Sequence, residues 1–122
     1  MSVQTHTVVE TPSYLRAAST AGLSGQEREA IVTAIASEPM LGDEIRGTGG
    51  CRKIRFSGRG KRKSGGYRVI TFFTGPAMPV FLLTVFSKGE RSDLGKAGQN
   101  ALRKLTKEIA EGYKARGRTR GK

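Results

Sequence analysis

One uninterrupted apolar run limits the possible folds of this chain more than any other feature. Residues 80–86 read VFLLTVF, in which both alternating sets of positions are apolar apart from Thr84. Because successive side chains of a strand point to opposite faces of its sheet, the run predicts a central strand covered on both faces. The rest of the chain should supply the neighbouring strands and the covering helices.

Two further strands are predicted directly before this run. The segment CRKIRFS alternates, so that Lys53 and Arg55 share the face opposite to the apolar Ile54. In YRVITFFT, Arg68 shares its face with Ile70. Short connections, including the turn-forming segment GPAMP, favour an antiparallel meander. The polar face of this sheet would carry Lys53, Arg55 and Arg68, with Lys88 at the end of the central strand.

The N-terminal third predicts a short strand followed by two helices. THTVVET has strand character, and Pro12 suits a first helical position, where its missing N–H costs nothing. Gly22 should end this helix. Ser24 and Glu27 form a capping-box pattern, from which a second helix runs to about Glu38.

A last helix should begin near Asp93, with an apolar stripe at Leu102, Leu105, Ile109 and Tyr113. A second capping-box pattern, Ser87 with Glu90, lies before it. The element order is then β-α-α-β-β-β-α, which predicts a single α+β domain whose antiparallel sheet has helices on one face. We expect the domain to span residues 1–112 and the basic residues 113–122 to form a flexible tail.

The charge of the chain points to an anionic partner. Its formal net charge is +12, from 22 Lys and Arg against 10 Asp and Glu, which favours nucleic acid, an acidic protein or an anionic membrane surface. No apolar run reaches the ~18 residues of a spanning helix, and the N-terminus lacks a signal-peptide pattern, so a cytoplasmic location is expected. From Ile45 to Gly89 there are no acids but ten basic residues: Arg46, Arg52, Lys53, Arg55, Arg59, Lys61, Arg62, Lys63, Arg68 and Lys88.

Several kinds of site are excluded by residue content. With Cys51 as the single cysteine and His6 as the single histidine, neither an internal disulfide nor a Cys/His zinc site can form. We expect Cys51 to be a buried structural residue. A Ser-His-Asp triad would have to use His6, and the spacing around Gly60 and Lys61 does not match a phosphate-binding loop. No metal or cofactor is therefore expected.

A basic surface can still support one reaction. RNA carries its own nucleophile, the 2′-OH, so a protein can cleave RNA by orienting that oxygen and stabilising charge on the phosphate. Arg and Lys provide the electrostatic part, and a Lys crowded by other cations can act as a base. The alternative is that these cations only bind phosphates. The loop SGRGKRKSGG, with Arg59, Lys61, Arg62 and Lys63, should meet the RNA backbone in either case.

Two stretches of the sequence together resemble a known family. IRGTGGCRKIRFSGRGKRKSGGYRVITFF and PVFLLTVFSKGERSDL are similar to the RelE family of toxins from bacterial toxin–antitoxin systems, and most of all to its HigB-like branch. The similarity extends from about Ile45 to Leu105. It implies a RelE-like fold and an endoribonuclease that cleaves mRNA, commonly in the ribosome, without a metal and by 2′-OH attack.

The resemblance also implies roles for particular residues. Arg68 matches the arginine of the GYR motif, which holds the scissile phosphate. Arg55 matches a basic position on the preceding strand, and Lys53 and Lys88 complete the candidate catalytic set. Where some relatives have a tyrosine after the last strand, this chain has Gly95, which leaves Phe86 as the aromatic for stacking on a base. The candidate RNA-binding residues are Arg52, Arg59, Lys61, Arg62, Lys63, Phe86 and Arg91.

Two other functions compete with the ribonuclease. ParE-like relatives of the same fold inhibit DNA gyrase, and a basic protein can bind RNA or the ribosome without chemistry. Three basic strand residues on one face, with Lys88, favour the nuclease over the gyrase inhibitor. The partners implied by the resemblance are a helix-turn-helix antitoxin with an acidic segment, mRNA and the ribosome. The toxin–antitoxin complex should also bind its own promoter DNA.

Overall fold

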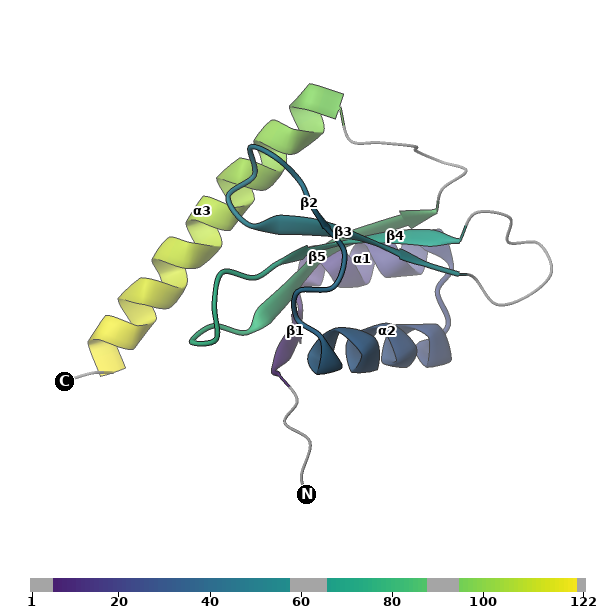
Figure 1. Cartoon of the computed structure of the whole chain (residues 1–122), viewed down its shortest axis with the longest axis horizontal. Coiled ribbons are helices and arrows are strands. Elements are labelled where there is room, and N and C mark those ends of the chain that lie inside the picture. Colours follow the sequence, from purple (N-terminus) through teal and green to yellow (C-terminus); the bar gives the residue numbers. More distant parts are fainter. Residues whose placement is uncertain (1–5, 58–65, 88–94, 121–122) are drawn as a thin grey trace, which may run out of the picture.

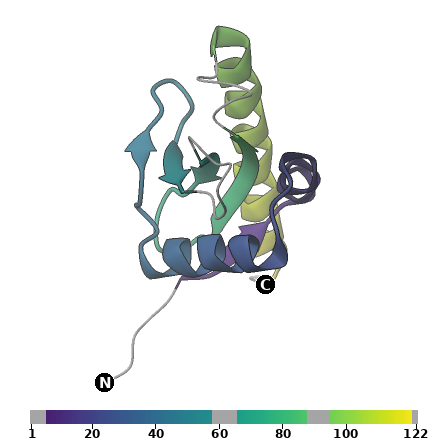
Figure 2. The same cartoon turned by 90° about the vertical axis from the view of Figure 1, so that its right-hand side faces the viewer.

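The residues that the structure describes form one mixed sheet with three helices (Figures 1 and 2). The computed structural model describes residues 6–57, 66–87 and 95–120, with side chains up to residue 112. Within these residues the strand order is β1-β5-β4-β3-β2. The strands are β1 (Val8–Glu10), β2 (Asp43–Glu44), β3 (Cys51–Phe56), β4 (Tyr67–Phe72) and β5 (Val80–Ser87), and the helices are α1 (Pro12–Ala21), α2 (Gly25–Ser37) and α3 (Gly95–Arg120).

Strands β3, β4 and β5 form the predicted antiparallel meander. The apolar run is an interior strand as expected, because β5 lies between β4 and β1. The sheet is not purely antiparallel, since β1 pairs with β5 in parallel. The two-residue strand β2, which the sequence did not indicate, adds the edge beyond β3. The α+β fold class is confirmed.

Helices α1 and α2 begin and end where their local signals predict. The side chain of Thr11 caps α1, and Gly22 ends it with a φ of 81°, a conformation that glycine adopts without strain. Both bonds of the capping box between Ser24 and Glu27 are present at the start of α2. Thr11 Oγ1 also donates to the carbonyl oxygen of Leu82 at 2.7 Å, which fastens the start of α1 to β5.

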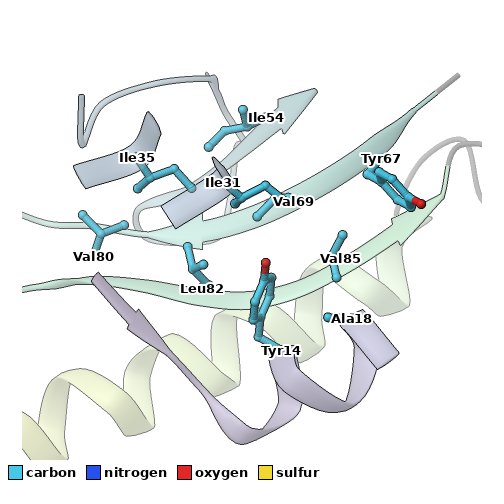
Figure 3. Close-up of a cluster of buried hydrophobic side chains, with 10 residues drawn as sticks. All are labelled: Tyr14, Ala18, Ile31, Ile35, Ile54, Tyr67, Val69, Val80, Leu82 and Val85. Atoms are coloured by element: carbon cyan, nitrogen blue, oxygen red, sulfur yellow. The ribbon is translucent and has the colours of Figure 1, made fainter. Parts of the chain in front are cut away.

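The larger core lies between the sheet and these two helices (Figure 3). Tyr14 from α1 and Ile35 from α2 meet Val69 of β4 and Leu82 of β5, and all four side chains are fully buried. Burying a large aliphatic or aromatic side chain contributes about 1.5–3 kcal/mol, so this cluster supplies much of the folding free energy.

Helix α3 packs on the opposite face of the sheet, so the prediction that all helices lie on one face is wrong in this detail. Leu102, Leu105 and Ile109 of α3 join a second cluster with Ile70 and other residues of that face: Cys51, Phe72, Phe81, Leu83 and Phe86. Figure 1 shows the helix crossing the strands obliquely. The apolar positions on both faces of β5 require cover on both sides, which explains the arrangement.

The C-terminal region continues as helix farther than the sequence suggests. The backbone of α3 is helical to Arg120, where a flexible tail was expected from residue 113. The division into residues 1–112 and 113–122 stays a prediction.

The predicted capping box of Ser87 with Glu90 and the helix start near Asp93 fall largely outside the described residues, and α3 is described from Gly95. No helix in the described ranges is long and apolar enough to cross a bilayer.

Tyr14 provides a test of the larger core. Its hydroxyl is buried and has no hydrogen-bond partner among the described residues, and burial, reinforced by the charge of Glu10, raises its pKa to about 12. An unfolded tyrosine ionises near pH 10, so the stability that the neutral form provides is complete below pH 10 and is lost as the pH rises toward 12. The loss should amount to about 2–3 kcal/mol.

We therefore expect Tyr14→Phe to be neutral or stabilising by up to about 1 kcal/mol at pH 7, because it removes an unsatisfied hydroxyl. Above pH 10 the variant should become progressively more stable than the wild type. Urea unfolding of both proteins between pH 7 and 11.5 measures the difference. Parallel pH profiles would show that Tyr14 does not ionise in this way.

Candidate functional site

A row of two arginines and one phenylalanine crosses the three central strands. Arg55 of β3 lies directly opposite Arg68 of β4, and Arg68 lies opposite Phe86 of β5. The register places Lys53 and Ile70 in the next row. These rows belong to the face on which α3 packs, because Ile70 and Phe86 are part of the second apolar cluster. We use the name cationic row for Arg55 and Arg68 together with Lys53 of the neighbouring row.

An irregularity in β5 helps to form this row. The register between β4 and β5 shifts after Ile70, so that Ile70 pairs with Thr84 while Thr71 pairs with Leu82. Leu83 is the extra residue. A bulge of this kind changes which face the following side chains occupy, and here it places Phe86 beside Arg68.

Two arginines directly opposite each other weaken a sheet. Like charges at such positions repel, and the side chain of Arg68 is also only 8% exposed, which adds a cost of desolvation. Arg55 is exposed. The adjacent positions Ile70 and Phe72 on the same strand and face are apolar, so packing alone does not require a charge at Arg68. A costly residue at such a position is typical of a functional site.

Lys53 fits the predicted surface, whereas Arg52 and Phe86 do not. Lys53 is half-buried and lies one row from the arginines. Arg52 pairs with Thr71 and so points to the other face, where its Nη1 donates to the carbonyl oxygen of Gly42 at 2.9 Å. Phe86 is 5% exposed and packed in the second cluster, so its ring is not presented for stacking. The remaining predicted residues lie outside the described part of the chain: Arg59, Lys61, Arg62, Lys63, Lys88 and Arg91.

The GTGG turn that precedes β3 holds α3 in place. Thr48 is fully buried there, and its Oγ1 donates to the carbonyl oxygen of Ile45 at 2.6 Å and accepts from the N–H of Cys51 at 3.2 Å. Thr106 of α3 donates to the carbonyl oxygen of Thr48 at 3.1 Å. The glycines on either side of Thr48 have φ values of 77° and 79°, which other residues adopt only with strain. Sequence reasoning found this motif but not its role, since the hydrogen bond joins residues 58 positions apart.

Cysteine and histidine do not contribute to the row. Burial raises the pKa of the Cys51 thiol to about 11, although the hydrogen bond from Thr48 acts in the opposite direction. The thiol is therefore protonated near neutral pH, as expected for a structural residue. His6 lies within 2.9 Å of the carbonyl oxygen of Met78 through Nε2 and stacks edge-on against Phe73. Among the residues described, no three His, Cys, Asp or Glu side chains gather into a metal site.

One open hollow lies away from the cationic row. It has a volume of about 690 Å³ and is lined by His6, Pro39, Met40, Glu44, Gly50, Arg52, Phe73, Thr74, Gly75 and Pro76. The walls include residues that follow the end of β4, whereas Arg68 is near its start. Because the hollow contains neither opposed arginine, we place the candidate site on the row and not in the hollow.

The fold and the row define a small α+β protein with a cationic patch beside a covering helix. No known protein-family profile matches the sequence. By structure the chain is similar to the E. coli toxin RelE, solved in the free state as a variant with two arginines replaced by alanine. The two chains are 19% identical with a TM-score of 0.53, and the match covers 72% of this chain and 88% of that chain. A likeness at this identity establishes a shared fold.

The opposed arginines can be tested through stability. Arg55→Gln removes the repulsion from Arg68, so we expect the free energy of unfolding to rise by a few tenths of a kcal/mol at low salt. The gain should shrink as salt screens the charges. Arg16→Gln, which neutralises an exposed arginine on α1, is the control and should change little. If Arg55→Gln lowers the stability instead, Arg55 has a structural role.

Proposed function

We propose that this protein is the toxin of a type II toxin–antitoxin system and acts as an endoribonuclease on mRNA. The observation that supports this most directly is the pair of opposed arginines on a sheet face, in a fold shared with the toxin RelE. The GYR and GTGG motifs, which resemble the HigB-like branch of the RelE family, support the finer assignment. The proposed substrate is mRNA on the ribosome.

The proposed reaction uses the substrate's own 2′-OH. This oxygen attacks the adjacent phosphorus in line with the 5′-oxygen, so that a 2′-O–P bond forms and the P–O5′ bond breaks. The 2′-OH proton leaves to a base, and the 5′-oxygen receives a proton from an acid. The products are a 2′,3′-cyclic phosphate and a 5′-hydroxyl. Because the nucleophile is part of the RNA, no metal-bound water is required.

The cationic row suits the charge that develops in this reaction. As the oxygen attacks, negative charge accumulates on the two non-bridging phosphate oxygens. A guanidinium offers paired N–H donors to such oxygens, and donors already held in place cost no reorganisation during the step. Arg68, held by the buried strand β4, is assigned to the scissile phosphate, and the exposed Arg55 lies beside it on β3. Lys53 and Lys88 are the cationic candidates for the proton transfers.

A protein with this activity needs a partner that neutralises it. We propose an antitoxin whose acidic segment lies against the cationic row, because that contact would relieve the repulsion between the arginines and exclude RNA. Long-range attraction would speed its association, which should slow with added salt. A helix-turn-helix domain on the antitoxin would allow the complex to bind its own promoter.

One observation favours a second candidate function. The low exposure of Arg68 suits a protein whose exposed cations, including Arg55, bind RNA or the ribosome without chemistry. The two functions differ in what they require of Arg68. Catalysis needs the guanidinium itself, whereas phosphate binding by the exposed cations does not.

Arg68→Met separates these functions without opening a cavity. Methionine fills a similar volume without the charge, and a far-UV circular dichroism spectrum like that of the wild type checks that the variant folds. We expect the variant to fold but to lose RNA cleavage by about 10²–10³ fold, and to lose growth arrest on expression. Arg16→Met, an exposed arginine on α1, is the control and should keep full toxicity. A folded Arg68→Met protein that still cleaves mRNA at the wild-type rate would refute the catalytic assignment.

A further inference from the structure

The outer surface of α3 carries a line of three cations and one asparagine that the proposed reaction does not use. Lys96, Asn100, Arg103 and Lys107 are spaced by four, three and four residues and are all exposed. Positions with this spacing lie above one another on a helix, and the line is about 16 Å long. Lys104, also exposed, widens it. We call Lys96, Arg103, Lys104 and Lys107 the α3 ridge.

Packing fixes the direction in which the ridge points. Leu102, Leu105, Thr106 and Ile109 of the same helix face the sheet and the GTGG turn. The ridge therefore occupies the remaining surface of the helix and faces away from the core. No ion pair binds the ridge side chains to an acid within the described residues. Arg103 donates to the side-chain oxygen of Asn100, a residue of the same line.

The cations of the ridge repel one another along the helix. Like charges three or four residues apart, such as Lys104 with Lys107 and Arg103 with Lys107, destabilise a helix. Glu108 and Glu111 lie four residues after Lys104 and Lys107, so the C-terminal end of the ridge is mixed in sign, whereas residues 96–107 hold four cations and no acid. A solvated helix face is usually mixed in sign, so a run of one sign indicates an anionic partner.

The chemistry of the ridge favours a phosphate backbone over a protein or a membrane. Protein interfaces are built around apolar and aromatic residues and are depleted in Lys, but the ridge has no large apolar side chain. An interfacial membrane helix needs a free apolar face, whereas the apolar face of α3 is packed on the sheet. Exposed cations along one side of a helix, with no base-reading surface, suit the phosphate backbone of a nucleic-acid strand.

We propose that the α3 ridge is a second RNA contact, which binds the phosphate backbone of a structured RNA while the cationic row acts on the scissile phosphate. The inference rests on the proposed function for its choice of RNA as the partner. It deepens that proposal by assigning α3 to docking on a helical RNA, such as those of the ribosome. The contact is independent of sequence and of the cleavage step.

The test is a pair of double variants with equal charge. Arg103→Gln/Lys107→Gln removes two cations from the ridge, and Arg16→Gln/Arg46→Gln removes two exposed cations elsewhere. The probe is a blunt-ended RNA duplex, whose binding is measured across a range of salt concentrations. We expect the ridge variant to bind more weakly and the slope of log K against log salt to become shallower by about 1.4–1.8, because the variant leaves two phosphates without a neutralising cation. The control should keep the wild-type slope.

Two further measurements separate this proposal from the proposed function. On translating ribosomes saturated with the protein, the ridge variant should cleave the message at the wild-type maximal rate, since saturation compensates for weaker docking and the cationic row is unchanged. If no variant cleaves RNA but the slopes still differ, the ribonuclease proposal fails and the ridge stands. Equal slopes for the two double variants would overturn the ridge. So would a ridge variant that loses affinity for polyglutamate while keeping its affinity for the duplex, because the ridge would then serve an acidic protein.

Discussion

The structure depends on the burial of β4 and β5 from both sides. Every residue of β4 is buried, and β5 is buried at all but two of its eight positions. Such strands need cover on both faces, which α1 and α2 provide on one side and α3 on the other. The hydrogen bond between Thr106 and Thr48 and the interior position of β5 follow from the same need. A short chain buries a smaller fraction of its surface than a long one, so two strands that are apolar on both faces need helices on both sides of the sheet.

The candidate site occupies a row of this sheet in which two arginines lie beside one phenylalanine. Along the α3 face of β4, Phe72 and Ile70 belong to the core, and the next residue on that face is Arg68. The arginine faces a second arginine, so a fully buried strand carries one half of a like-charge pair. A guanidinium on a fully buried strand has little freedom to move, which suits the proposed role of Arg68 in stabilising a transition state.

Local signals in the sequence were enough to predict the ends of α1 and α2 and the face of the sheet that carries the cations. The helix caps at Thr11, Ser24 and Gly22 depend on neighbouring residues, and strand alternation places Lys53, Arg55 and Arg68 on one face. Interactions between distant residues could not be predicted. The 3.6-residue period of α3 gives its apolar stripe but not the face it covers, and the bulge at Leu83 leaves no clear mark in an apolar run. The burial of Phe86 follows from the bulge, which sets its face, and from α3, which covers that face. The roles expected of the cationic loop before β4 and of Lys88 and Arg91 after β5 stay predictions.

The central claim is that the RNA provides its own nucleophile at the cationic row. The most direct measurement uses an mRNA on translating ribosomes in which the single nucleotide before the cleavage point carries 2′-deoxyribose. We predict cleavage of the all-RNA message, with a 2′,3′-cyclic phosphate and a 5′-hydroxyl at the new ends, and no cleavage of the substituted message at that bond. Cleavage of the substituted message at the same bond, or new ends with a 3′-hydroxyl and a 5′-phosphate, would contradict it.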